Sequence, residues 1–254
     1  MNPSCLLEAQ AISKRFGGVR ALHEVSLTIR QCEIYGLIGP NGAGKTTFFN
    51  VLTGLCTASS GNFNFAGAPL DISAPHLVAQ AGIARTFQNI RLFANMTALE
   101  NVMVGRHLRT HAGVIGAVLG CAATRAEENA IQQRAVELLH YVGIADRANH
   151  LARNLPYGDQ RRLEIARALA TDPKLLALDE PAAGMNATET AALRVLIEGL
   201  RNDGLTVMLI EHDVKLVMGL CDRVAVLDYG EKIAEDVPEN VQRNSKVIEA
   251  YLGA

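Results

Sequence analysis

The sequence has no tryptophan, only 5% aromatic residues and no excess of positive charge, with 24 basic and 26 acidic residues among 254. Proteins that bind nucleic acid stack bases on aromatic side chains or carry a basic face. The formal net charge of −2 therefore argues against a nucleic acid as partner. Hydrophobic residues make up 49% of the chain, which is enough for a large core. The length of 254 residues allows one large domain or one domain with an inserted lobe.

Cysteines are few, and no apolar stretch is long. No run reaches the roughly 18 apolar residues that a membrane-spanning helix needs. Residues 112–123 come nearest, and we expect them to form either a buried helix or a loop near a membrane partner. Residues 1–5 lack the basic and apolar parts of a signal peptide, so we expect any membrane association to come through a partner. The cysteines form no close pair and no zinc-binding spacing, which indicates reduced thiols in a cytosolic protein: Cys5, Cys32, Cys56, Cys121 and Cys221.

What the sequence does contain is a phosphate-binding loop of the pattern G-x-x-x-x-G-K-[ST]. It lies between residues 34–38, which predict a buried strand, and residues 46–52, which predict a helix. Backbone N–H groups of such a loop surround phosphate oxygens, and the helix N-terminus adds partial positive charge. We expect Lys45 to reach the β- and γ-phosphates, Thr46 to bind Mg²⁺ and Thr47 to support the α-phosphate. The expected nucleotide-binding residues of the loop are Gly39, Pro40, Asn41, Gly42, Ala43, Gly44, Lys45, Thr46 and Thr47.

Two acidic residues, Asp179 and Glu180, follow four apolar residues. Ligands of open α/β sheets bind at the carboxyl ends of the strands. We therefore expect Asp179 to hold Mg²⁺ through water and Glu180 to act as the base on an attacking water. His212 follows a second apolar strand and is a candidate contact for the γ-phosphate, although a lone histidine is usually structural. His107 and His111 have the spacing of metal ligands, but no third ligand is nearby, which favours a solvated face.

Apolar strands alternate with helical segments, which indicates an α/β fold with a mainly parallel sheet. Residues 6–12 and 21–29 predict an N-terminal antiparallel part, joined by a polar turn at residues 14–18. In that turn Phe16 is expected either to fill the edge of the core or to offer a face to a flat ligand. Residues 89–157 lack strand patterning and predict an inserted helical lobe, which leaves 1–88 and 158–254 as the α/β core.

Periodicity and capping signals predict the other elements. Thr97 and Glu100 have the spacing of a capping box at the start of a helix. In the long helix at 125–142, Ala130 is expected to be one of the apolar positions. The expected strands are 61–65, 83–87, 174–178, 205–210, 223–227 and 232–234, and the expected helices are 73–81, 97–104, 125–142, 158–170, 187–201, 214–220 and 245–252.

In order along the chain, these features are similar to those of the ATP-binding domain of ABC transporters. The matching features are the phosphate loop, Gln88 after a strand, the segment LPYGDQRR at 155–162, the Asp179–Glu180 pair and His212. The resemblance covers essentially the whole chain. The runs RTFQNIRLF, MTALENVMVG, LPYGDQRRLEIARALA, LDEPAAGMN and IEHDVKLVM resemble an ATPase subunit of bacterial branched-chain amino acid importers.

The resemblance implies an ATPase that hydrolyses ATP to ADP and phosphate, with Mg²⁺, to drive solute translocation. It also implies a second ABC ATPase subunit, either a different chain or a second copy of this one, two membrane permease subunits and, indirectly, an external solute-binding protein. Such a subunit lies peripherally at the cytoplasmic face of the plasma membrane. Phe16 would stack on adenine, Gln88 would touch Mg²⁺ and the attacking water, and residues 89–100 would dock on the permease. A signature segment would complete the ATP site of the opposite subunit, and it comprises Leu155, Pro156, Tyr157, Gly158 and Asp159.

The signature segment departs from the family pattern Leu-Ser-Gly-Gly-Gln. Pro156 replaces a serine whose hydroxyl would donate to the γ-phosphate, and proline has neither hydroxyl nor N–H. Asp159 replaces glutamine and places negative charge near phosphates, while Asn186 ends the D-loop where aspartate is usual. We therefore expect an asymmetric heterodimer, in which the site built with this chain's signature is the weaker one.

Other functions stay open at this point. Within the family, the solute could be an amide, urea or an aromatic amino acid, or the chain could serve a lipid exporter, although an exporter is expected to keep the usual signature. A soluble ABC ATPase of DNA repair or of the ribosome usually has two such domains or a long coiled coil, and neither is present. A small-molecule kinase would lack the signature segment and the acidic pair.

Overall fold

The computed structural model describes residues 4–107 and 122–252. Most of the apolar run at 112–123, and His111, lie outside the described residues. The chain divides into two compact units. The first comprises Met1–Arg85 and Lys174–Ala254, and the second comprises Thr86–Pro173.

The first unit is built around a six-stranded sheet. Its order is β10-β9-β3-β8-β7-β6, and all neighbours are parallel except the β9–β10 hairpin. Every residue of β3, β7 and β8 is buried, as continuous apolar strands covered on both faces require. Their carboxyl ends therefore meet at one edge. The strands are β3 (Ile34–Ile38), β6 (Ile83–Arg85), β7 (Leu175–Asp179), β8 (Thr206–Ile210), β9 (Arg223–Asp228) and β10 (Glu231–Asp236).

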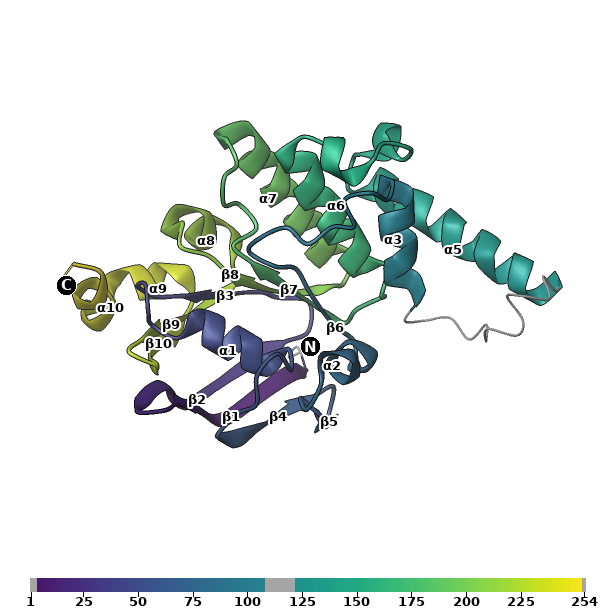
Figure 1. Ribbon diagram of the computed structural model, residues 1–254. Coiled ribbons are helices and arrows are strands. Elements are labelled where there is room, and N and C mark those ends of the chain that lie inside the picture. The colour runs from purple at the N-terminus through teal and green to yellow at the C-terminus, as the bar shows by residue number, and fades with distance from the viewer. Residues whose placement is uncertain (1–3, 108–121, 253–254) are drawn as a thin grey trace. The chain divides into compact units, whose positions relative to one another are not determined.

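A four-stranded antiparallel sheet completes the first unit, in the order β2-β1-β4-β5. Helix α1 (Lys45–Leu52) lies between the two sheets (Figure 1) and shares one hydrophobic core with both. Phe48 of α1 packs edge-on against Phe63 of β4, with ring centroids 5.8 Å apart. This packing fixes the position of α1 and therefore also of the loop that directly precedes α1. The strands are β1 (Cys5–Phe16), β2 (Val19–Arg30), β4 (Ser60–Phe65) and β5 (Ala68–Pro69).

The other helices of the first unit begin at recognisable signals. Pro75 occupies the first turn of α2, and the Asn186 side chain accepts the N–H of Glu189 to cap α7. Figure 1 shows α7 and α8 on the face of the six-stranded sheet opposite α1. The helices are α2 (Pro75–Ala81), α7 (Ala187–Asn202), α8 (Val214–Leu220), α9 (Pro238–Arg243) and α10 (Ser245–Leu252).

Helices dominate the second unit, with α3 (Ala98–Arg106), α5 (Ala122–Tyr141) and α6 (Tyr157–Leu169) packed together and short 3-10 turns at Ala145–Arg147 and Ala152–Asn154. The capping box at Thr97 and Glu100 is confirmed, because each residue accepts the other's backbone N–H. One of the apolar positions predicted for α5 is wrong. Ala130 is exposed, and Ile131 is buried in its place.

The predicted fold class is confirmed, and the differences concern boundaries. β1 runs on to Phe16, so the turn expected at residues 14–18 shrinks to two glycines. The strand expected at 83–87 stops at Arg85, since the N–H of Phe87 donates to the Glu164 carboxylate instead of to a neighbouring strand. Helix α6 falls in the compact unit with α3 and α5, whereas the sequence placed most of it with the α/β core.

Candidate nucleotide site

The phosphate loop follows β3 and has a conformation that requires glycine at two positions. Gly39 has φ 150°, and a Cβ there would lie 2.1 Å from the backbone oxygen of Leu227. Gly44 has φ 100°, and its Cβ would lie 2.7 Å from the backbone oxygen of Ala21. Both contacts are closer than any carbon can approach, so the tight curve depends on missing side chains. Residues 39–44 thus place the N-terminus of α1 at the edge of the sheet.

The Lys45 ammonium lies over this loop. It donates to the backbone oxygens of Gly39, at 2.7 Å, and of Pro40, at 2.9 Å. Burial lowers the pKa of Lys45, and the nearby charge of Glu180 raises it. The N–H of Gly230 donates to the Ala43 oxygen at 3.0 Å, which ties the loop to the β9–β10 turn. The cation is therefore oriented by neutral carbonyls and available to an anion.

Asp179 is the last residue of β7 and is buried. Its Oδ2 lies 2.9 Å from Nη2 of Arg85, whose other terminal nitrogen donates to Asn50 Oδ1 at 2.7 Å and to Thr53 Oγ1 at 2.8 Å. The Arg85 guanidinium also lies 4.6 Å from the centre of the Phe49 ring. Arg85 therefore joins the carboxylate to α1, which begins at the phosphate loop. Arg85 was not among the site residues predicted from the sequence.

Glu180 has a left-handed backbone, with φ 46°, which is uncommon for a residue with a side chain. Its N–H donates to the Ile210 oxygen at 2.9 Å, so the start of the loop after β7 is held against β8. Oε2 of Glu180 lies 3.7 Å from Nδ1 of His212, whose side chain is 61% exposed. The structure thus brings together the acid and the histidine that the sequence singled out separately.

Glu211, beside His212, is a second residue at this edge that was not among the predicted site residues. It is 1% exposed, and its two carboxylate oxygens accept the N–H of Ala182, at 2.9 Å, and of His212, at 3.2 Å. Burial raises the pKa of this carboxyl, and the backbone donors oppose that effect. The side chain therefore links the segment after Glu180 to the segment that carries His212. The position of Glu211 directly after the buried strand β8 is the sequence signal that could have identified it.

Phe16 ends β1 and is 51% exposed, with the Lys14 ammonium 4.9 Å from the centre of its ring. The ring therefore does not fill the core, which was one of the two alternatives.

Gln88 and the signature segment belong to the second unit. The backbone oxygen of Gln88 accepts from Arg161 Nη2 at 2.9 Å. Leu155 and Gly158 are buried. Pro156 precedes α6 without any side-chain cap, Tyr157 accepts a hydrogen bond from Arg161, and Asp159 lies in the first turn of the helix.

Magnesium fits the residues of the first unit. Thr46 is exposed at the start of α1, and Asp179 offers a carboxylate. One hydroxyl and one carboxylate suit Mg²⁺, which keeps several waters and shares nucleotide phosphates as ligands. Within residues 4–107 and 122–252 no group of three His, Cys, Asp or Glu side chains is placed to hold a metal by itself. His107, expected on a solvated face, is exposed.

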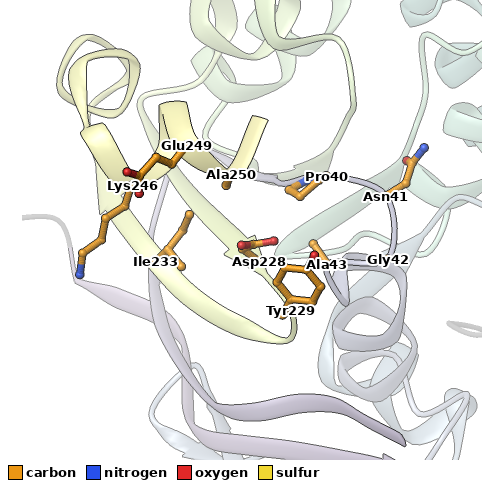
Figure 2. Close-up of a pocket in the computed structure, with 10 residues that line it drawn as sticks. All are labelled: Pro40, Asn41, Gly42, Ala43, Asp228, Tyr229, Ile233, Lys246, Glu249 and Ala250. Atoms are coloured by element: carbon orange, nitrogen blue, oxygen red, sulfur yellow. The ribbon is translucent and has the colours of Figure 1, made fainter. Parts of the chain in front are cut away.

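A cavity of about 470 Å³ lies beside the phosphate loop, between the β9–β10 turn and α10 (Figure 2). Burial raises the pKa of the Tyr251 hydroxyl, whereas a hydrogen bond from the backbone of Gly39 lowers it. The C-terminal helix therefore reaches the phosphate loop. The cavity is lined by Pro40, Asn41, Gly42, Ala43, Asp228, Tyr229, Ile233, Lys246, Glu249 and Ala250.

A family model described as ABC transporter matches residues 22–183. The chain belongs to the ABC transporter family. A second model, described as branched-chain amino acid ATP-binding cassette transporter, matches residues 231–254 of this ABC protein. Over 249 residues it is 46% identical to the high-affinity branched-chain amino acid transport ATP-binding protein LivG of Salmonella typhimurium, with 98% of each chain covered. It is 43% identical to BraF of Pseudomonas aeruginosa, which has the same description, over the same length and coverage.

Solved ABC structures have the same fold. The ADP conformation of an ATP-binding cassette of an ABC transporter matches with a TM-score of 0.86 at 30% identity, covering 99% of this chain and all of that one. A dimeric cassette in a post-hydrolysis state with ADP and Pi matches with a TM-score of 0.76 at 26% identity, covering 92% and 99%. In the part of this ABC chain that the structure describes, no helix is long and apolar enough to cross a membrane.

Proposed function

We propose that this chain is the ATP-binding and ATP-hydrolysing subunit that energises an importer of branched-chain amino acids. The observation that carries the proposal is the meeting of the phosphate loop, Asp179, Glu180 and His212 at one edge of the six-stranded sheet. The identity to LivG and BraF over nearly the whole chain supports the choice of solute.

The residues of the first unit have separate roles in binding and hydrolysing ATP. Lys45 and the N–H groups at the start of α1 bind the phosphates, and the exposed face of Phe16 stacks on adenine. Thr46 and Asp179 hold Mg²⁺, which neutralises charge on the phosphates when it is bound. Glu180 takes a proton from the attacking water, and His212 contacts the γ-phosphate.

The partners follow from what this chain offers. Two permease subunits hold it at the cytoplasmic face of the membrane, and residues 89–100 dock on them. A second ABC ATPase subunit supplies a signature segment to this chain's phosphate loop. An external binding protein delivers the solute to the permease.

The two ATP sites of this heterodimer are unequal. Pro156 has no donor for a γ-phosphate, and Asp159 in the first turn of α6 weakens the attraction of that helix N-terminus for anions. A lost hydrogen bond to a charged group costs about 1.5–3 kcal/mol. The site that contains this chain's own phosphate loop therefore hydrolyses ATP faster than the site that contains its signature.

Co-purification and uptake test the function. The chain should copurify with two permeases and a second ATPase, and deletion of its gene should abolish uptake of labelled leucine. If the deletion instead abolishes uptake of an amide, urea or an aromatic amino acid, the result would support that compound as the solute. A defect in lipid export would support the exporter.

Two substitutions test the asymmetry. Glu180→Gln in this chain should cost more ATPase activity than the matching change in the partner, and equal losses would refute unequal sites. Pro156→Ser should tighten nucleotide-dependent dimerisation, and unchanged or weaker dimerisation would count against the role given to Pro156.

A further inference from the structure

Arg161 and Glu164, one turn apart on α6, hold the backbone of residues 87–91 within the second unit. The two guanidinium Nη atoms donate to the backbone oxygens of Phe87, at 2.7 Å, and of Gln88, at 2.9 Å. Oε1 of Glu164 accepts the N–H groups of Phe87 and Arg91, each at 3.3 Å. The two side chains also pair with each other at 2.9 Å. The helix therefore binds the loop through both its donors and its acceptors.

Both side chains of this ion pair are buried. Arg161 is 0% exposed and Glu164 is 1% exposed. A buried ion pair often adds no net stability relative to apolar side chains of similar volume. In addition, Nε of Arg161 has no hydrogen-bond partner among the described residues, which costs free energy. Stability alone is therefore a poor reason for the pair, whereas holding a backbone segment in place is a direct consequence of its bonds.

The same arginine reaches the signature segment. Its Nη2 donates to the Tyr157 hydroxyl at 3.2 Å, and its guanidinium lies 5.9 Å from the centre of the Tyr157 ring. One side chain thus contacts the loop that contains Gln88 and the segment that approaches the partner's ATP. By contrast, the contact of Arg91 with the Phe87 ring, at 4.3 Å, lies inside the loop and does not join it to α6.

We propose that Arg161 and Glu164 are positioning residues that make residues 87–91 and the signature segment move as one body. A partner that displaces the loop then displaces the signature with it, because the loop backbone cannot slide along α6 without breaking four hydrogen bonds. The identity of that partner, a permease, rests on the proposed function, whereas the clamp itself does not.

Hydrogen exchange on the full-length protein tests the clamp. In Glu164→Gln, amide exchange in peptides that cover residues 86–92 should rise roughly tenfold or more. The one oxygen of an amide cannot serve both the two N–H groups, which Oε1 accepts, and Arg161 Nη1, which Oε2 accepts. Arg161→Lys, which keeps the charge but not the fork, should have the same effect. The neighbouring Arg162→Lys is the control and should leave exchange unchanged. Unchanged exchange in either clamp variant, folded by circular dichroism, would overturn the proposal.

A reconstituted transporter separates positioning from a merely structural role. In Arg161→Lys, solute moved per ATP hydrolysed should fall roughly fivefold or more, the lower range of measured coupling between sites. A proportional fall of transport and hydrolysis, with the ratio unchanged, would overturn the coupling role. A wild-type complex that transports nothing would overturn the proposed function and leave the exchange result to decide on the clamp.

Discussion

Replacing Arg85 by methionine should destabilise the protein by about 3–5 kcal/mol, the usual cost of breaking a buried ion pair from one side. The Arg85 and Asp179 side chains are 9% and 4% exposed, so water cannot take the place of the guanidinium. Methionine has a similar length and fills much of the same volume, which limits the cavity term. The change also removes the bonds of Arg85 to Asn50 and Thr53. In a chain of this size, the loss corresponds to a fall in Tm of roughly 6–20 °C.

Thermal unfolding with and without Mg²⁺ and nucleotide is the assay. Without Arg85, the Asp179 carboxylate loses its neighbouring positive charge, so a metal ion nearby becomes more favourable. We therefore expect Mg²⁺ with nucleotide to raise the Tm of Arg85→Met more than it raises that of the wild type. An equal increase in both proteins would refute the location of the metal beside Asp179.

A double substitution checks the electrostatic origin of the effect. Asp179→Asn removes the charge that Arg85 balances, so adding it to Arg85→Met should recover part of the lost stability. The two changes are then non-additive, as expected for side chains in contact. Additive losses in the double variant would show that Arg85 acts through packing and not through its charge.

Three further predictions concern the residues around the loop. Glu180→Gln should keep Mg-ATP binding while hydrolysis falls about 10²–10⁴-fold, the usual contribution of a general base; lost binding in a filter assay would contradict the role. Gly39→Ala should abolish nucleotide binding, because its Cβ would lie 2.1 Å from Leu227 O, whereas the control Gly18→Ala, with no atom within 4 Å, should bind normally in a fluorescence titration. Burial raises the pKa of Glu211 above 4.5, so this carboxyl stays protonated to a higher pH in the folded state than in the unfolded state. Wild-type stability should therefore fall as pH rises from 4.5 through the raised pKa. Glu211→Gln should show a smaller fall in urea unfolding, because the buried Glu33 contributes a fall of the same sign, and parallel pH profiles of the two proteins would reject the prediction.

Local patterns predicted much of the fold. Residues 34–38 are apolar throughout and form β3 without any difference in bounds, and Val214–Leu220 and Ser245–Leu252 form the expected helices. The phosphate loop was also predictable, because its glycines, lysine and hydroxyls are adjacent in sequence. Ala130 was assigned to the wrong side of α5, since an alanine marks the apolar face of a helix only weakly and its neighbour Ile131 is larger.

The buried charged residues were not predictable in the same way. Arg85 pairs with Asp179, and Glu164 binds the backbone of Phe87, each far away in the sequence. A single charged residue within an apolar strand or helix does not reveal its partner, because burial of a charge is acceptable only once the fold has supplied that partner. Glu211 is the exception, since its place after a buried strand pointed to the same edge as Asp179.

The left-handed backbone of Glu180 has a consequence for the evolution of this protein. Glycine adopts such a conformation without the steric cost that glutamate carries. The genetic code places glutamate and glycine codons one base change apart, so a mutation that relieves the strain and removes the carboxylate arises readily. Under the role proposed for Glu180 as general base, selection for stability alone would enrich that mutation and yield a more stable but inactive protein. On that proposal, only continuous selection for turnover keeps glutamate at this position.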